Sequence, residues 1–346
     1  MKMTNTLHSL VPTVHGGLLR DALIVCLIAF AGVVGAKASE APDTYMIVDL
    51  SGGPDAASYP VSFQSGEPAK GWGDDCRSYK LVLRKIPAGS FMMGSPSNEL
   101  GRLDNEDLHR VTISHSFYIG VFVVTQRQWE LVMGENPSRN ASSGQLLCPV
   151  DSVTFDMLRG PDEGDNWPDS DSVDADSFFG RIRQKTGKSF DLPTEAQWEY
   201  ACRAGTETAL NNGQNLDHTA SSRVCSEVAN TCIDKDENGD WHATSSTQKV
   251  GLRKPNAWGL YDMHGNVDEF CLDWYKRNLG TAPVRDPVGP RKLPSERNPY
   301  MFESTHVLRG GAVWEYAKDA RSASRGHSSP VSPSFSHGQG FRVACP

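Results

Sequence analysis

The pattern of apolar and polar positions predicts β-strands in the first part of the chain. Thr44–Leu50 and Tyr79–Ile86 alternate or run apolar and contain β-branched residues, which is typical of strands. The segment "AGSFMMGS" then predicts a tight turn and a short strand, and "VTISHSFYIGVFVVT" returns to strand character. We therefore expect several short strands joined by loops.

Two capping boxes predict the start of two helices. Thr125 with Gln128 opens "QRQWELVMG", and Thr194 with Gln197 opens "EAQWEYACRAG". Each stretch ends in a glycine, the usual helix stop, and each carries a tryptophan that we expect to pack into the core. A weaker helical pattern follows in "SFFGRIRQKTG". Few helices among many short strands, without heptads or long repeats, predict an α+β domain.

The N-terminal residues predict a signal peptide. Arg20 precedes an apolar run from Ala22 to Ala36, and Ala36-Lys37-Ala38 resembles a cleavage site. The apolar run is shorter than the ~20 residues that span a bilayer. We therefore expect residues 1–38 to be removed and the protein to be exported, that is secreted, periplasmic or at the cell surface, without a membrane span.

Charge and cysteine content narrow the partners and the compartment. The formal charge of −8 argues against nucleic acid, which needs a basic surface. Seven cysteines remain after residue 38, and export would allow some of them to form disulfides. We expect Cys225 and Cys232, six residues apart in a turn-rich segment, to form one such bridge. We expect the partner to be a protein or a small ligand, whose identity the sequence does not give.

Several motifs, in order, resemble the formylglycine-generating enzyme family, whose members contain a sulfatase-modifying factor domain. They are "IPAGSFMMGS", "VTQRQWELVMG", "LPTEAQWEYACRAG", "PNAWGLYDMHGNVDEF", "VLRGG" and "GFRV". The resemblance implies a C-type-lectin-like α+β fold over residues 80–346, preceded by an extension at 39–79 that contains a short strand.

The resemblance also implies where a catalytic copper site would lie. Active members of the family oxidise a cysteine of a sulfatase to formylglycine, and they bind copper through two cysteines after the R-G-G turn. Glu315 and Ala320 occupy those positions here. A carboxylate is a hard ligand and alanine is none, so neither replaces a thiolate for Cu(I). We expect no formylglycine chemistry and no copper, unless Cys271 and Cys345 fold into the gap.

Calcium is the metal that the sequence favours, as a structural ion. By resemblance, one site would use Asn266, the Val267 carbonyl and Glu269, and a second would use Asn230, the Thr231 carbonyl and Asp240. Independently, "DKDENGD" resembles the first half of a calcium loop, with Asp234, Asp236 and Asn238 as ligands. The twelfth position of that loop is Ser245 rather than glutamate, so an acidic surface turn explains it equally well.

The residues after the R-G-G turn predict a binding face. Aromatic, acidic, basic and histidine side chains are mixed there, as in the contact loops of lectin-like domains, where a rigid scaffold carries a changeable surface. The candidate ligand contacts are Trp314, Glu315, Tyr316, Arg321, Arg325, His327, Phe335 and His337. The sequence therefore predicts an exported, non-catalytic binding protein.

Two enzymatic alternatives stay open at this point. One is an active formylglycine-generating oxidase that uses the displaced cysteines. The other is an iron-dependent relative with ligands among four histidines, although none of them shows a helical i, i+4 spacing. These histidines are His109, His242, His264 and His327.

Overall fold

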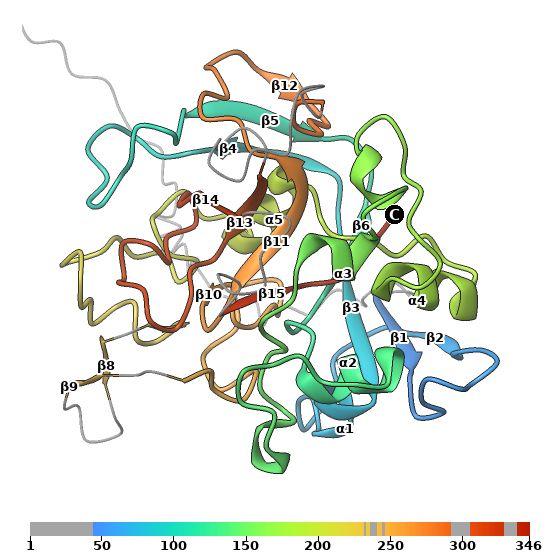
Figure 1. Cartoon of the computed structure of the whole chain (residues 1–346). Coiled ribbons are helices and arrows are strands. Elements are labelled where there is room, and N and C mark those ends of the chain that lie inside the picture. The colour runs from blue at the N-terminus through green and yellow to red at the C-terminus, as the bar shows by residue number, and fades with distance from the viewer. Residues whose placement is uncertain (1–43, 232, 236–240, 244–245, 292–304, 329–337) are drawn as a thin grey trace, which may run out of the picture. The chain divides into compact units, whose positions relative to one another are not determined.

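The computed structural model describes residues 44–231, 233–235, 241–243, 246–291, 305–328 and 338–346 (Figure 1). Short strands occur along the whole of these ranges and all the described helices lie between residues 75 and 203, which confirms the predicted α+β class. The expected signal peptide at 1–38 lies outside them. Within the described ranges, no helix has the length and apolar character needed to cross a membrane.

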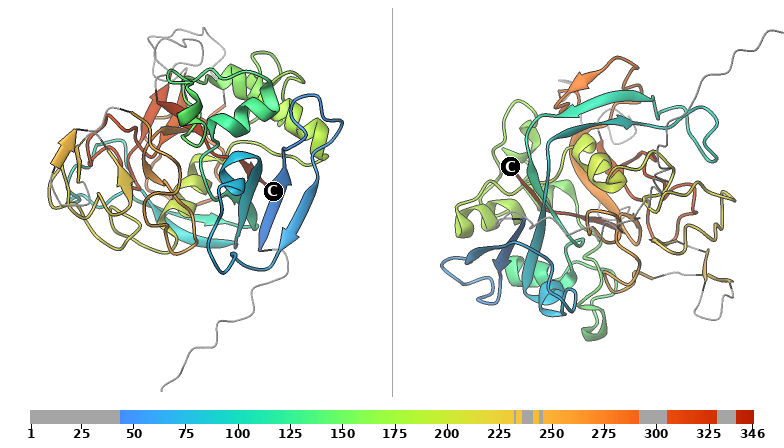
Figure 2. Two further views of the ribbon diagram at one scale, coloured as in Figure 1. Left: turned by 90° about the horizontal axis from the view of Figure 1, so that it is seen from below. Right: turned by 180° about the vertical axis from the view of Figure 1, so that it is seen from behind.

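A five-stranded antiparallel sheet contains the predicted N-terminal strands. Its order is β16-β6-β3-β1-β2, and its strands are β1 (Tyr45–Asp49), β2 (Val61–Gln64), β3 (Lys80–Ile86), β6 (Phe117–Gly120) and β16 (Ala344–Cys345). Strands β1 and β2, blue in both views of Figure 2, lie side by side, and β1 also pairs with β3. The extension at 39–79 therefore contributes two strands to the sheet of the following domain.

The two helices with predicted capping boxes begin where expected, among five α-helices in the described ranges. The five are α1 (Asp75–Ser78), α2 (Gln126–Met133), α3 (Phe155–Arg159), α4 (Phe178–Thr186) and α5 (Glu195–Arg203), with 3₁₀ turns at Ser143–Gln145 and Gly164–Asn166. Both capping boxes are formed. Helix α5 ends on Ala204, which has φ 46°, one residue before the glycine expected to end it. Helix α3 is capped by Thr154 but is too short to show a helical period.

The two helix tryptophans are buried, as predicted, but in different parts of the core. Trp129 on α2 is fully buried and stacks on Phe178 with ring centroids 5.3 Å apart. Trp198 on α5 packs in a second cluster with Met263 and Cys271. The two capped helices therefore anchor two neighbouring clusters rather than one shared core.

A second sheet supports the C-terminal segment. Its order is β14-β13-β11-β15, and its strands are β14 (Gly326–Ser328), β13 (His306–Arg309), β11 (Asp268–Trp274) and β15 (Gln339–Phe341). Strand β11 pairs antiparallel with β13 on one side and parallel with β15 on the other. It lies in the middle of Figure 1, between two segments that are distant from it in sequence. Side chains alternate along a strand, so Asp268 and Glu269 point to opposite faces.

Three smaller sheets complete the described fold. One has the order β12-β5-β4, with β12 (Val284–Arg285), β5 (His109–Ile113) and β4 (Gly89–Met93). The two-stranded sheets are β7 (Ala229–Asn230) with β10 (His264–Gly265), and β8 (Ile233–Lys235) with β9 (Trp241–Ala243). The β8–β9 hairpin lies at the left edge of Figure 1.

Candidate functional site

The R-G-G turn brings the C-terminal segment back onto β13. Gly310 and Gly311 have φ values of 94° and 77°, a region that side chains rarely adopt. A Cβ atom on Gly311 would lie 2.9 Å from the carbonyl oxygen of Asp319. Glycine is therefore required where the segment 311–320 folds against its own start.

Arg309 holds the second half of this segment through its backbone. The side chain is fully buried, and its guanidinium donates to the carbonyl oxygens of Ser322, Ala323 and Ser324. The same group forms an ion pair with the buried Glu199 carboxylate of α5. The arginine therefore fixes the path of the main chain from residue 322 to 324.

Two further arginines extend this frame. Arg321 pairs with Glu99 and Glu106, both at 2.6 Å, and donates to the carbonyl oxygen of Gly101. Arg325 pairs with Glu195 at 2.5 Å and 2.9 Å. Arg321 was expected to contact a ligand, but its buried guanidinium is used within the protein, so we assign it a structural role.

The framed segment encloses a hollow of about 280 Å³, which we call the C-terminal hollow. Residues of β11, β13, β14 and β15 and of the turn after β13 line this hollow, together with one residue from the loop before β5. They include Leu103, Asp268, Trp314, Glu315, Asp319, Arg325, His327 and Gln339.

Three carboxyl groups share this hollow. Glu315 accepts a hydrogen bond from the Ala312 backbone N–H at 3.0 Å, and Asp268 accepts one from Gly311. Lys318 lies 3.9 Å from Asp319 and is partly exposed. No arginine or lysine of the described ranges forms an ion pair with Asp268 or Glu315.

Burial and mutual repulsion raise the pKa of two of these acids. Burial raises the pKa of Asp268 well above its ordinary value, and the neighbouring carboxyls of Glu315 and Asp319 raise it further. The pKa of Glu315 is also raised, mainly by burial. Burial lowers the pKa of His327, so this imidazole favours its neutral form. Asp268 and Glu315 therefore keep their protons to a higher pH than ordinary carboxyl groups do.

Trp314 forms a wall of the C-terminal hollow and remains 42% exposed. A Cβ atom on Gly338 would lie 1.9 Å from the indole ring, so this glycine allows the ring to lie directly on the backbone. Trp314 also lines a second hollow of about 480 Å³ with Arg139 and Asp151. An exposed tryptophan thus borders two concavities.

The structure brings together part of the predicted ligand-contacting set. Trp314, Glu315, Arg325 and His327 line the C-terminal hollow, and Tyr316 is exposed on the same segment. Phe335 and His337 lie outside the described residues. Sequence reasoning missed Asp268 and Gln339 as lining residues, and the acidic residue in "GNVDEF" was the available signal for the first.

The residues at the expected copper positions do not fit that metal. Ala320 is buried, and its carbonyl oxygen lies 2.6 Å from Nδ1 of His264. No cysteine of the described part of the chain lines the hollow. Cys271 is buried in the cluster around Trp198, and Cys345 lines a different cavity. The displaced thiols therefore do not meet in the C-terminal hollow.

The described cysteines are all unpaired thiols. They are Cys76, Cys148, Cys202, Cys225, Cys271 and Cys345. Cys232, the expected partner of Cys225, lies outside the described residues.

The first expected calcium site does not fit that ion either. Both carboxylate oxygens of Glu269 accept hydrogen bonds from Arg342, and one also accepts from Trp198. The Asn266 side-chain oxygen accepts from the backbone of Gln248 at 2.9 Å. The guanidinium of Arg342 already balances the charge of Glu269, so it would repel a calcium ion placed there.

The second expected calcium site is described in part. Asn230 and Thr231 are buried, and the Asn230 side-chain oxygen accepts from Arg253 at 2.8 Å. Asp236, Asn238 and Asp240 lie outside the described residues, as does the side chain of Asp234. Calcium binding by this loop stays a prediction.

Of the four histidines considered as iron ligands, the three whose side chains the structure describes do not form a metal site. His264 is buried between Ala320 and Asn211, and Nδ1 of His109 contacts the backbone of Asp107. His327 packs against Tyr275, and the side chain of His242 lies outside the described residues. Among the described residues, no group of three or more His, Cys, Asp or Glu side chains could hold a metal ion.

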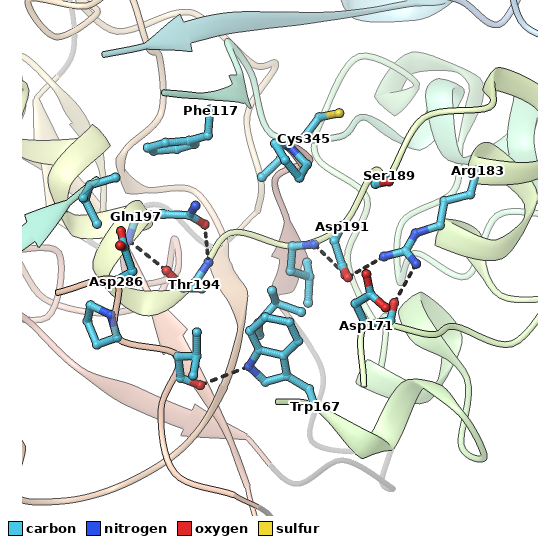
Figure 3. A pocket seen from close by; sticks show the side chains of 17 residues that line it. Phe117, Trp167, Asp171, Arg183, Ser189, Asp191, Thr194, Gln197, Asp286 and Cys345 are labelled. Atoms are coloured by element: carbon cyan, nitrogen blue, oxygen red, sulfur yellow. Dashed lines mark hydrogen bonds and ion pairs between the residues drawn. The ribbon is translucent and has the colours of Figure 1, made fainter. Parts of the chain in front are cut away.

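An apolar cavity of about 300 Å³ lies elsewhere in the domain (Figure 3). Phe117 and Trp167 face it from opposite sides, and Trp167 donates to the carbonyl oxygen of Val288. At its edge Asp191 pairs with Arg183 at 2.6 Å. Of its charged groups, Arg183 and Asp191 pair with each other and Asp286 accepts a hydrogen bond from Ser114. In the C-terminal hollow, Asp268 and Glu315 form no ion pair within the described ranges, so that hollow is the better candidate for specific recognition.

Comparison with known proteins identifies the family and the fold of the chain. The chain is 32% identical over 190 residues to "Chaperone protein LppX" of Paenibacillus barcinonensis, covering 48% of this chain and 64% of that protein. It is 25% identical over 304 residues to "Formylglycine-generating enzyme" of Mus musculus, with 76% of each chain covered. The solved structure of PvdO from Pseudomonas aeruginosa matches with a TM-score of 0.58 and 25% identity, covering 77% of this chain and 94% of that one.

The chain thus spans slightly less than two thirds of the length of the Paenibacillus relative. The family description that matches is "Sulfatase-modifying factor enzyme 1-like domain", over residues 76–345, which is most of the sequence. This protein therefore belongs to the sulfatase-modifying factor enzyme 1-like domain family.

Proposed function

We propose that this protein is an exported, non-catalytic member of its family that binds a ligand or protein partner in the C-terminal hollow. One observation carries the proposal: the position expected for a copper-binding cysteine holds Glu315, which faces other carboxyl groups rather than a thiol. Hard oxygen ligands do not hold Cu(I) as a thiolate pair does. A framed, concave face remains, and binding is the activity that it supports.

The surroundings of the hollow support a partner-binding role. Leu103 and Trp314 are 44% and 42% exposed where they line it, and Tyr316 is 46% exposed nearby. Exposed tryptophan and tyrosine are the residues that most often dominate binding energy at interfaces. A relative is named a chaperone protein, which is consistent with a protein partner.

The first experiment tests for loss of formylglycine chemistry. Purified protein, Cu(I) and a C-x-P-x-R peptide are incubated in air, with a formylglycine-generating enzyme as the positive control. We expect no mass loss corresponding to conversion of the thiol to an aldehyde. Conversion that disappears in Cys271→Ser or Cys345→Ser would overturn the proposal and establish the displaced-cysteine oxidase.

The second experiment tests for binding. A diverse set of small molecules and peptides is screened by thermal shift, and each hit is remeasured on Glu315→Ala. Glu227→Gln is the matched control, because Glu227 is an exposed acid that pairs with Lys254 and does not line the hollow. We expect hits that the Glu315 variant loses and the control keeps. Hits that are indifferent to Glu315 would place binding elsewhere.

Export is tested separately. N-terminal sequencing of the protein recovered from the expressing cell's exterior or periplasm should begin at Ser39. A first residue upstream of the apolar run would contradict cleavage and favour retention of the segment.

A further inference from the structure

We infer that the C-terminal hollow takes an organic cation, a primary ammonium or guanidinium group on an apolar stem. The inference rests on the proposed binding function and names the chemical class of its ligand. The cation would lie among Asp268, Glu315 and Asp319, and the stem would lie along Trp314. A free amine and a lysine or arginine side chain share this chemistry.

The charge balance of the cavity supports a cation. The two arginines that reach the lining, Arg309 and Arg325, are already committed to Glu199 and Glu195 on α5. Lys318 stands on the turn, 40% exposed, and approaches Asp319 at 3.9 Å. Three acids therefore meet in one concavity with a single partly exposed lysine nearby. Placing a positive group there would relieve their repulsion.

The shape and the aromatic wall specify the rest of the ligand. At about 280 Å³ the hollow has room for one charged group and a short stem. Trp314 is held in place by its contact with Gly338 and presents a ring that stays 42% exposed. Tryptophan is the best of the aromatic residues at stabilising a nearby cation, and its ring also covers apolar surface. Leu103 adds apolar surface on the same lining.

Binding of a cation here must be linked to protons. The ionisable groups lining the cavity are Asp268 from β11, Glu315 and Asp319 from the turn, His327 from β14, and the paired Arg309 and Arg325, while Lys318 lies beside Asp319. Because the pKa values of Asp268 and Glu315 are raised, these two carboxyl groups keep their protons to a higher pH than ordinary ones do. A cation favours the ionised carboxylates, so its binding releases protons and strengthens as pH rises.

The experiment measures calorimetric binding of three probes of the same length: hexylamine, hexanol and hexanoate. A second arm uses a short peptide with one lysine and its norleucine counterpart. We expect the amine or the lysine peptide to bind and the neutral and anionic probes not to bind. Amine binding identifies a free-amine ligand, and binding of the lysine peptide alone identifies a protein side chain; either supports the inference. Titration in two buffers of different ionisation enthalpy should reveal proton release.

Variants connect the signal to the cavity. Glu315→Gln and Asp319→Asn should each weaken binding ~10- to 100-fold, as expected for one charge-assisted contact. Trp314→Ala should weaken it roughly 3- to 30-fold, and Glu227→Gln should leave it unchanged. Equal binding of all three probes, or binding indifferent to these variants, would overturn the inference. If no cation binds while other screened ligands still depend on Glu315, the ligand class is wrong and the binding function stands.

Discussion

The guanidinium of Arg309 lies against the carboxylate of Glu199, and both side chains are completely buried. The same carboxylate accepts from Arg203 at 2.8 Å, one helical turn away. Two buried cations thus share one anion, and Arg309 also binds three carbonyl oxygens of the segment around the hollow. Glu199 is therefore one of two glutamates through which helix α5 binds the C-terminal segment; the other is Glu195, which pairs with Arg325.

Removing this charge should destabilise the domain strongly. Glu199→Gln leaves Arg203 without a counter-charge in the core and Arg309 with only its longer contact to Glu195, at 3.7 Å, which costs about 3–5 kcal/mol. Urea denaturation should show this as a lower midpoint. Asp104→Asn is the matched control, because its ion pair with Arg277 is exposed to solvent and contributes little to stability. Similar midpoints for the two variants would contradict the structural role of Glu199.

Replacing Asp273 by asparagine should stabilise the protein at neutral pH. Burial raises the pKa of Asp273 from 3.8 to about 8, so the folded state holds a proton that the unfolded state releases above pH 3.8. This difference in proton binding lowers the free energy of unfolding by up to about 4 kcal/mol at pH 7, and the effect vanishes below pH 3.8. Asparagine keeps an acceptor for the Glu195 backbone N–H, a bond of 2.7 Å, and has no charge to lose. The gain of Asp273→Asn should therefore shrink as pH falls from 8 to 4; a gain independent of pH would refute it.

The opposite pH dependence is expected at His306. Its ring is buried between Phe155 and Trp274, with centroids 3.4 Å and 3.9 Å away, and burial lowers its pKa from 6.5 to about 3. The unfolded state therefore binds an extra proton below pH 6.5, and stability is lost as pH falls towards 3. The free energy of unfolding of His306→Gln, relative to that of the wild type, should rise by about 2 kcal/mol when the pH falls from 7 to 5. Denaturation curves at both pH values measure the difference, and a constant difference would be the contrary result.

The contact between Gly338 and Trp314 should be sensitive to one methyl group. Gly338 has φ 81°, and a Cβ atom there would overlap the indole ring. Gly338→Ala should therefore displace Trp314 and change its fluorescence, while the carboxyl groups of the hollow stay in place. Ligand binding should weaken to about the level of Trp314→Ala. Wild-type affinity in the alanine variant would show that the ring position is unimportant.

The sequence was sufficient where local chemistry decides the structure. The capping residues Thr125 and Thr194 begin helices as expected, because a side chain that bonds its own backbone acts over three residues. Helix α3 was missed because five residues are too few for an apolar period. The R-G-G motif marks where the chain turns back after β13, because the positive φ values of Gly310 and Gly311 require glycine.

The partners of buried charges could not be predicted in this way. Arg321 is separated by more than 200 residues from Glu99 and Glu106, and nothing local distinguishes it from a ligand-binding arginine. The same holds for Glu269, whose pairing with Arg342 removes it from the expected calcium site. Charges far apart in sequence meet only when the fold is complete, and their pairing decides which of them remain available.

The arginine frame has a consequence for how new specificities could arise on this scaffold. Arg309 holds the C-terminal segment through three carbonyl oxygens, which every amino acid supplies. Substitutions at Glu315, Tyr316, Lys318 and Asp319, which are all at least partly exposed, should therefore alter the proposed recognition without loosening this attachment, whereas Ala317 between them is fully buried and must stay small. A combinatorial library confined to those four positions would sample different binding chemistries at nearly constant stability, as randomised loops do on an antibody framework.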